Sequence, residues 1–356
     1  MFRWRLWLLL PIFLMACGSV STEDSTQAPT ARPTLTATPR STELPPVPTP
    51  IPLGSAERPI QLAFLAEDTP SNRQAAQDFA EALQTELATF RLGLYEGLVV
   101  EIAFLDSAEA ALDALCNARD TAVFADSLTF AAAARNCDAV PRLQTLREGE
   151  RGVAFEIIVN RSILVNITQL RGRAFCAVAV DDPFSFVYPT LALRANGVDP
   201  LADFTDIFTG FEDQTEMLLA VSGRYEPGRI PLCAGTAMPL ADFNRILDDL
   251  REDTERGLTE AQANQLILPT LADDDSLWTP IPYEILVFPP AGRFAEALRE
   301  AVVAALLDLQ SDAGSAQADL QTLLPHDELE AVNAADYADF LGWLERAGWD
   351  MASATN

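Results

Sequence analysis

Apolar and polar residues follow two different rhythms along most of this chain. Runs of about four to eight apolar residues predict buried strands, and apolar residues spaced about three or four apart predict helices. The first such pair is a strand over residues 59–66, followed by a helix that Thr69 caps and Pro70 begins. Further strands are expected over residues 98–105, 121–125, 153–159, 174–180, 207–209, 230–235 and 283–288. Because helical patterns separate these strands, the order predicts an α/β protein with mostly parallel sheets flanked by helices.

Two of the strands, residues 153–159 and 283–288, bracket a block of alternating strands and helices. A chain produces this order when it crosses from one α/β lobe to another and later returns. Within the block, residues 240–275 are acidic and helical in pattern, and we expect them to form a peripheral insertion without an assigned role. The expected boundaries are residues 57–152 for the first lobe, 153–280 for the second, and 281–356 for the return to the first with the C-terminal helices.

The beginning of the chain is not part of either lobe. Two Arg residues precede an apolar run, residues 6–15, which is too short to span a membrane comfortably. The run ends in Leu14-Met15-Ala16-Cys17, which resembles the bacterial lipobox, in which the Cys is lipidated and becomes the first mature residue. We expect residues 1–16 to be a lipoprotein signal peptide and Cys17 to carry lipid. The alternative is an ordinary signal peptide followed by a disulfide-bonded Cys.

Residues 17–56 are rich in Ser, Thr and Pro and contain almost no large apolar residues. Such a segment cannot bury a core, so it is expected to act as an extended tether between the lipid and the folded body. The predicted location is therefore the outer face of the bacterial cytoplasmic membrane, where the protein is lipid-anchored rather than membrane-spanning.

Cysteine usage is consistent with an exported protein. With Cys17 assigned to lipid, four Cys remain, and an even number in an oxidising compartment indicates two disulfides. Proximity along the chain favours Cys116 with Cys137 and Cys176 with Cys233, although four Cys allow three pairings.

The charge and composition exclude several functions. The formal net charge is -28, and the chain contains no Lys, so all 24 basic residues are Arg. An acidic surface disfavours nucleic acid. Without Lys, a G-x-S-x-G motif or metal-ligand spacing, and with His326 as the single His, nucleophilic and metal catalysis lack their parts. We therefore expect neither an enzyme nor a cofactor.

The segment from Arg173 to Pro189 is the best candidate for a ligand-facing turn. Its apolar run, residues 174–180, is interrupted by Asp181-Asp182-Pro183, and a helical pattern begins near Ser185. Open α/β sheets bind ligands at the carboxyl ends of their strands, where such turns lie.

Several segments, read in order, resemble the solute-binding proteins of ABC importers, specifically the phosphate/phosphite/phosphonate-binding family. They cover most of the chain after the tether, apart from residues 240–275. The resemblance implies a two-lobed Venus-flytrap fold of the type 2 periplasmic-binding-protein class. It also implies a monomer that traps a small molecule between its lobes by hinge closure and presents it to a membrane permease. The segments are RPIQLAFLAEDTP, TAVFADSLTF, GVAFEIIVNRSILVNITQLRGRAFCAVAVDDPFSFVYPTLALRANGVDP, FTGFEDQTEMLLAVSGR, PIPYEILVFPP and LEAVNAADYADFLGWLERAG.

The sequence departs from the family pattern where the family holds its anion. The second-lobe turn of the family carries Ser and Thr residues before an aromatic-Pro pair. Here Tyr188-Pro189 matches the pair, but Asp181-Asp182-Pro183-Phe184 replaces the hydroxyl run and leaves only Ser185. The family's Gly-Ser-His-Asp reads Gly210-Phe211-Glu212-Asp213, and its first-lobe Gly-Pro-Leu-Ser-Tyr reads Asp126-Ser127-Leu128-Thr129-Phe130. Each change removes an anion-holding group or adds a carboxylate.

These departures support two hypotheses. In the first, the protein is a transport receptor whose cleft binds a cationic or polar organic ligand: carboxylates neutralise the ligand and aromatic rings stack on it. For each carboxylate the alternative role is a solvated or helix-capping group, and for each aromatic residue it is core packing. In the second hypothesis, the protein is a sensor or interaction lipoprotein on the same fold. The expected ligand-binding residues are Asp68, Asp126, Ser127, Phe130, Glu156, Asp182, Ser185, Phe186, Tyr188, Glu212 and Asp213.

Overall fold

The computed structural model describes residues 52–90, 94–224, 232–253, 257–267, 279–311 and 314–349. The predicted signal peptide, residues 1–16, and the lipidation site Cys17 lie outside the described residues, as does most of the tether. Among the helices that are described, none has the length and apolar character needed to cross a membrane.

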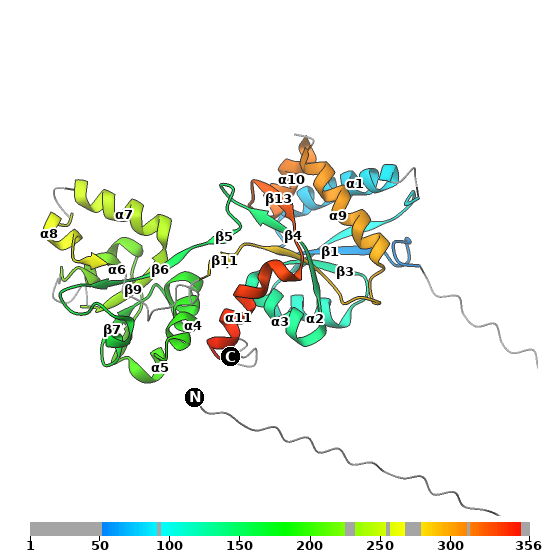
Figure 1. The fold of residues 1–356 in the computed structure, drawn as a ribbon. Coiled ribbons are helices and arrows are strands. Elements are labelled where there is room, and N and C mark those ends of the chain that lie inside the picture. Colours follow the sequence, from blue (N-terminus) through cyan, green and yellow to red (C-terminus); the bar gives the residue numbers. More distant parts are fainter. Residues whose placement is uncertain are drawn as a thin grey trace, which may run out of the picture. The chain divides into compact units, whose positions relative to one another are not determined.

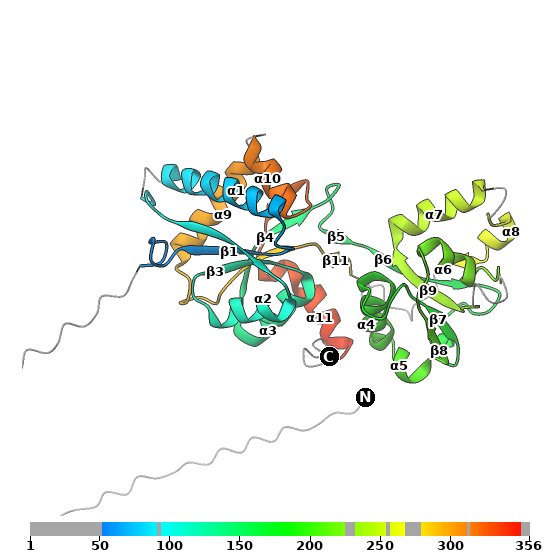
Figure 2. The ribbon, with the colours of Figure 1, turned by 180° about the vertical axis from the view of Figure 1, so that it is seen from behind.

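The first lobe is built on a six-stranded sheet with helices on both faces (Figures 1 and 2). Apolar side chains on one face pack against α1 (Pro70–Thr89), α9 (Glu296–Ser311) and α10 (Ser315–Leu323). The other face packs against α2 (Ala108–Asn117) and α3 (Ser127–Cys137). The strand order is β13 (Glu328–Ala331), β4 (Val140–Leu146), β12 (Ile285–Phe288), β3 (Thr121–Ala125), β1 (Ile60–Leu65) and β2 (Val100–Leu105).

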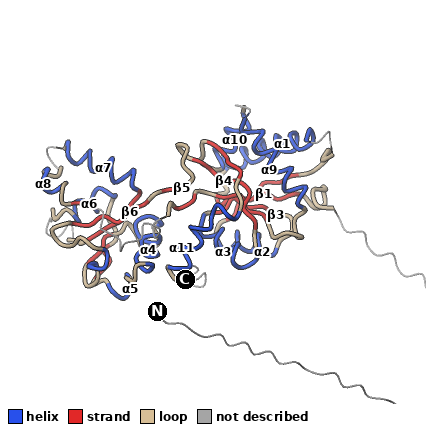
Figure 3. The backbone as a smooth tube through the Cα atoms, viewed as in Figure 1, coloured by secondary structure: helices blue, strands red, loops and turns tan. Residues whose placement is uncertain are grey.

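The second lobe is built on a five-stranded sheet that is also covered on both faces, as the blue helices and red strands of Figure 3 show. One face packs against α4 (Tyr188–Ala195) and against the segment before β7 that contains Leu164, Ile167 and Leu170. The other packs against α6 (Gln214–Val221), α7 (Leu240–Glu252) and α8 (Glu260–Ala263), and α5 (Pro200–Asp203) follows α4. The strand order is β10 (Leu266–Ile267), β6 (Phe155–Asn160), β9 (Gly235–Pro239), β7 (Ala174–Cys176) and β8 (Asp206–Phe208).

The predicted α/β class is confirmed, but the sheets are mixed rather than mostly parallel. In the first sheet β1 runs parallel to β2 and β3, whereas β12 and β4 pair antiparallel with their neighbours. In the second sheet β7 is parallel to β8 and β9, and β6 is antiparallel to β9. Parallel pairs occur where a helix connects successive strands. In the first sheet β12, on which the chain re-enters this lobe, lies between β3 and β4 and runs antiparallel to both. In the second sheet β6, on which the chain enters that lobe, runs antiparallel to β9.

Two segments connect the sheets, and both are held on the first-lobe side. They include β5 (Gly152–Val153) and β11 (Ile281–Pro282), which pair antiparallel so closely that a Cβ at Gly152 would collide with the carbonyl oxygen of Ile281. Arg147 donates two hydrogen bonds of 2.7 Å to Glu284, and its guanidinium lies 4.5 Å from the centre of the Tyr283 ring. Both connecting segments are therefore braced before they leave the first lobe.

The strand expected over residues 174–180 is shorter than predicted. It ends at Cys176, because the backbone N–H of Val178 donates to the Ser185 hydroxyl at 3.0 Å instead of to a strand. The strand expected over residues 230–235 instead spans Gly235–Pro239, and residues 230 and 231 of the expected range lie outside the described part.

The expected insertion, residues 240–275, is helical at α7 but not peripheral. Phe243, Ile246, Leu247 and Leu250 of α7 are buried in the second-lobe core. Residues 254–256 and 268–275 of this range lie outside the described part. The amphipathic pattern of α7 therefore reflects core packing, with the acidic residues on its solvent face.

Two disulfides form with the pairing that chain proximity favours. Cys116 bonds to Cys137 and joins α2 to α3, and Cys176 bonds to Cys233 and joins the end of β7 to the segment before β9. Their sequence separations of 21 and 57 residues correspond to a chain-entropy stabilisation of about 3.5 and about 4 kcal/mol respectively.

Replacing each disulfide pair with Ala is expected to lower the free energy of unfolding, measured by chemical denaturation, by about 3.5 and about 4 kcal/mol. The Cys176/Cys233 pair should cost more because its bond closes the longer loop. A denaturation midpoint that does not move when both bonds are reduced would contradict this expectation.

Candidate functional site

Parallel strands bring several polar turns of the first lobe to one edge. The carboxyl ends of β1, β2 and β3 lie together because the three strands run in the same direction. Glu67 and Asp68 follow β1, Asp106 follows β2, and Asp126 follows β3. This edge is therefore acidic, and it is the edge at which open α/β sheets bind ligands.

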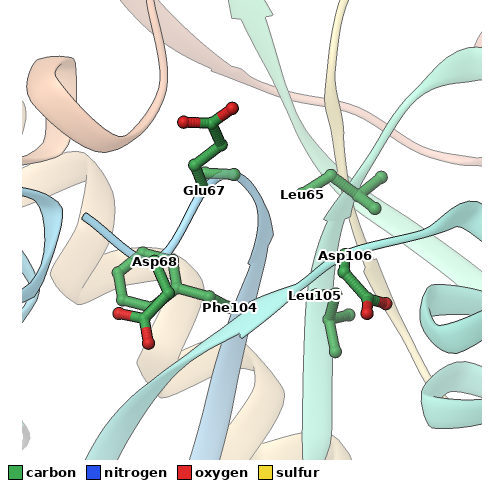
Figure 4. A pocket seen from close by; sticks show the side chains of 7 residues that line it. Leu65, Glu67, Asp68, Phe104, Leu105 and Asp106 are labelled. Carbon is green, nitrogen blue, oxygen red and sulfur yellow. The ribbon is translucent and has the colours of Figure 1, made fainter.

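A cavity of about 630 Å³ lies between the turns that follow β1 and β2. Its walls include three carboxylates, from Glu67, Asp68 and Asp106, together with the ring of Phe104 (Figure 4). Asp68 is in an exposed ion pair with Arg73 at 2.6 Å. Sequence reasoning named Asp68 but missed Glu67 and Asp106, although each comes directly after a predicted strand and could have been found from that position.

The second lobe has a corresponding edge. The turn after β7 contains Asp182 and Ser185, and the turn after β8 contains Glu212 and Asp213. The two turns are joined by a hydrogen bond from the N–H of Gly210 to the carbonyl of Val178. Because β6 runs antiparallel to β9, its first residues also lie at this edge, and Glu156 is paired with Met238 near the end of β9. The structure therefore brings four predicted carboxylates to one edge of the second sheet.

Three of the predicted ligand residues cap the helices that begin at these edges. Asp126 accepts hydrogen bonds from the N–H of Thr129 at 2.8 Å and from its hydroxyl at 2.9 Å. Asp182 accepts from the N–H of Ser185 at 2.6 Å, and Asp213 from the N–H of Glu216 at 2.9 Å. Helix N-terminal amides of this kind bind anions when they are free. Here a carboxylate of the protein accepts one such amide at each of the three helix starts.

Ser185 has a structural role as well. Its side chain is buried, and its hydroxyl accepts the hydrogen bond from the N–H of Val178 that ends strand β7. This hydroxyl therefore fixes the shape of the turn.

The aromatic residues expected to stack on a ligand are buried. Phe130 is 0% exposed in the first-lobe core, 4.8 Å from the ring centre of Tyr337. Phe186 and Tyr188 are also buried, and the Tyr188 hydroxyl is 2.7 Å from the Ser127 hydroxyl. Burial raises the pKa of Tyr188. These positions favour core packing over ligand stacking, because a buried ring has no face open to a ligand.

Glu156 is the predicted site residue with a perturbed carboxyl group. It is half-buried in β6, and burial raises its pKa. Its carboxylate has no hydrogen bond or ion pair within the described part of the chain. A carboxylate that is partly desolvated and unpaired is poised to gain from a cation. Glu212 differs from it, because Glu212 is exposed and only its backbone N–H is bonded, to Glu216 at 3.1 Å.

The described residues contain no group of three or more His, Cys, Asp or Glu that could hold a metal ion. His326 is buried, and its Nδ1 lies 2.6 Å from the carbonyl oxygen of Leu324.

Glu156→Gln is expected to raise the free energy of unfolding of the ligand-free protein at pH 7 to 8, because Gln has no charge to desolvate. The sign follows from the raised pKa: the ionised Glu156 costs stability above its folded-state pKa, and the cost disappears as protonation sets in. The gain should vanish below about pH 4, where Glu is protonated in both states. Thermal melts over this pH range measure it, and a loss of stability at pH 7 to 8 would contradict it.

Comparison with known proteins identifies the family. A family model described as "ABC transporter, phosphonate, periplasmic substrate-binding protein" matches residues 62–337. No curated protein matches the chain.

Solved structures of XAC2383 from Xanthomonas citri share the fold of this chain. The chloride-bound form has 15% identity and a TM-score of 0.51, covering 81% of this chain and 97% of that one. The ATP-bound form has 15% identity and a TM-score of 0.52, covering 81% and 96%. The methylphosphonate complex of PhnD1 from Prochlorococcus marinus has 14% identity and a TM-score of 0.45, covering 81% and 98%. The chain belongs to the phosphonate-binding family of periplasmic substrate-binding proteins of ABC transporters.

Proposed function

We propose that this family member is a lipid-anchored receptor of an ABC importer whose cleft binds a cationic or polar organic molecule instead of a phosphonate. The ligand is held between the acidic edges of the two lobes and is delivered to a membrane permease after hinge closure. The observation that carries this proposal is the capping of the edge helices by Asp126, Asp182 and Asp213.

Capping by carboxylates works against an anionic ligand in two ways. One amide at each helix start, from Thr129, Ser185 and Glu216, already donates to a capping Asp and is not free for a phosphonate. The three Asp side chains also bring negative charge to the place where the ligand's charge would lie. A doubly charged anion would therefore lose its hydration while meeting fewer donors and like charge, which is unfavourable.

The remaining charges at the edges favour a cation. Glu67 and Asp106 line the first-lobe cavity, and Glu156 and Glu212 lie at the second-lobe edge. Among the residues that line the cavity or form the turns after β7 and β8, none is basic, and nearby Arg73 is in an ion pair with Asp68. An ammonium group or heterocyclic cation would therefore find carboxylates that lack a partner of opposite charge.

The apolar part of such a ligand has suitable aromatic neighbours. Phe104 lines the first-lobe cavity, and Phe184 and Phe211 are partly exposed in the turns of the second lobe. These three rings, and not the buried Phe130 and Phe186, would contact the ligand through stacking or cation–π interactions.

A lipid anchor would hold the protein at the membrane. Cys17 would carry lipid at the outer face of the bacterial cytoplasmic membrane, and the tether, residues 17–56, would let a monomeric folded body reach its permease.

A thermal-shift screen is expected to show stabilisation by amines or heterocyclic cations and none by phosphonates. At about a hundredfold excess over Kd, binding should raise Tm by roughly 5 °C. A methylphosphonate hit at micromolar concentration would overturn the cationic-ligand proposal.

The combined variant Asp182→Asn and Glu212→Gln is expected to abolish that shift while the protein stays folded. Asn caps a helix as well as Asp does, so the first change removes charge without removing the cap. The matched control is Asp249→Asn with Glu252→Gln, which removes two charges from the last turn of α7. The control should bind the same amine unchanged, and equal loss of binding in both variants would show that net charge alone is responsible.

Cys17→Ala is expected to release the protein from the membrane. Wild-type chain expressed in bacteria should incorporate labelled palmitate and sediment with membranes, and the variant should do neither. Labelling that persists in the variant would contradict lipidation at Cys17.

A further inference from the structure

The two lobes share one buried apolar cluster. It includes residues of α3 from the first lobe, of β6 and α4 from the second, of the connecting strand β11, and of α11 (Ala338–Arg346) with the residues after it. The C-terminal helix therefore contacts both lobes, although it follows the chain's return to the first. The buried members are Ala131, Ala132, Phe155, Tyr188, Leu191, Ala192, Ile281, Phe340, Trp343, Leu344, Ala347 and Trp349.

A hydrogen bond inside this region joins the lobes directly. The Ser127 hydroxyl, at the start of α3, lies 2.7 Å from the Tyr188 hydroxyl, at the start of α4. Both side chains are buried, with exposed fractions of 1% and 6%. Because both hydroxyls are buried, removing either one leaves the other without this partner inside the protein, which is unfavourable.

An aromatic row extends from the second-lobe turn to α11. Phe184, in the turn that contains Asp182, lies 5.7 Å from Tyr188 between ring centres, and Tyr188 lies 6.3 Å from Phe155. Phe155 lies 6.4 Å from Trp343, which lies 6.0 Å from Phe340. These separations are within the range of favourable aromatic pairs. The ligand-facing turn and the C-terminal helix are therefore in continuous contact.

Trp343 is the centre of this contact. Its side chain is 1% exposed, and its indole N–H has no acceptor in the described structure. The ring therefore acts through its buried area alone, so Trp343→Phe removes packing without removing a hydrogen bond.

We propose that α11 couples the two lobes, and that Tyr188 and Trp343 are positioning residues that set the angle between them. Rotation of one lobe against the other about β5 and β11 must change the packing of this cluster. The cluster contains Ile281, which is part of β11, and Phe155, which follows β5. The inference rests on the proposed function only in that ligand capture requires the lobes to move. The coupling itself exists without ligand.

Calorimetry of the full chain, purified in detergent without ligand, tests the coupling. The wild type should unfold in one transition, because the shared cluster makes the lobes cooperative. Trp343→Ala should separate two transitions. The matched control, Phe79→Ala, removes an equally buried ring from the first-lobe core alone, so it should lower Tm and keep one transition. Two transitions in the wild type, or a single transition in Trp343→Ala, would overturn the proposal.

Milder variants keep the test decisive if Trp343→Ala does not fold. Trp343→Phe should raise the ratio of calorimetric to van 't Hoff enthalpy above one, while Phe79→Leu leaves it at one. A ratio of one in both would overturn the proposal. Because no ligand is present, a failed ligand screen does not affect these outcomes.

The hydroxyl pair is tested by a double-mutant cycle. Ser127→Ala and Tyr188→Phe should each raise the unfolding equilibrium constant about three- to tenfold. The double variant should resemble the single variants, because both remove the same bond. Full additivity would show that the two hydroxyls do not interact and would overturn the role of Tyr188.

Discussion

The edges of both sheets are shaped by one requirement: the first amides of a helix have no partner inside that helix and must find one elsewhere. Asp126, Asp182 and Asp213 supply it with their own carboxylates. The side chains that allow the helices to begin are therefore the same side chains that make the edges negative. At these positions one side chain serves both the fold and the charge of the edge, since an Asp that caps a helix also repels an anion.

Much of this fold could be predicted because its signals are local. A strand that is buried on both faces is a continuous apolar run, and caps such as Thr69 and Asp126 stand immediately before their helices. The disulfide pairing could be inferred from proximity because each bond links elements of one lobe, α2 with α3 and β7 with the segment before β9. Some carboxylates of the candidate site, such as Asp68 and Asp126, were predicted for the same reason: they stand just after strands.

The remaining features depend on contacts between distant segments. Tyr188 follows a turn, as a ligand-stacking residue would, but it is buried by contacts that include distant Ser127, 61 residues away. The strands β5 and β11 have two residues each, too few to show any periodicity, and they exist because the two connections pair with each other. The pattern of α11 predicts a helix with an apolar face but does not indicate that this face meets both lobes.

The turn after β7 has a further consequence for how such a receptor diversifies. Its shape depends on the Ser185 hydroxyl and on a capping oxygen at position 182. Val180, Asp181 and Pro183 are exposed beside these two residues. Substitutions at the exposed positions change what the turn presents without disturbing the bonds that form it. Substitutions at Val180, Asp181 and Pro183 should therefore cost little stability, because the bonds that form the turn come from other residues.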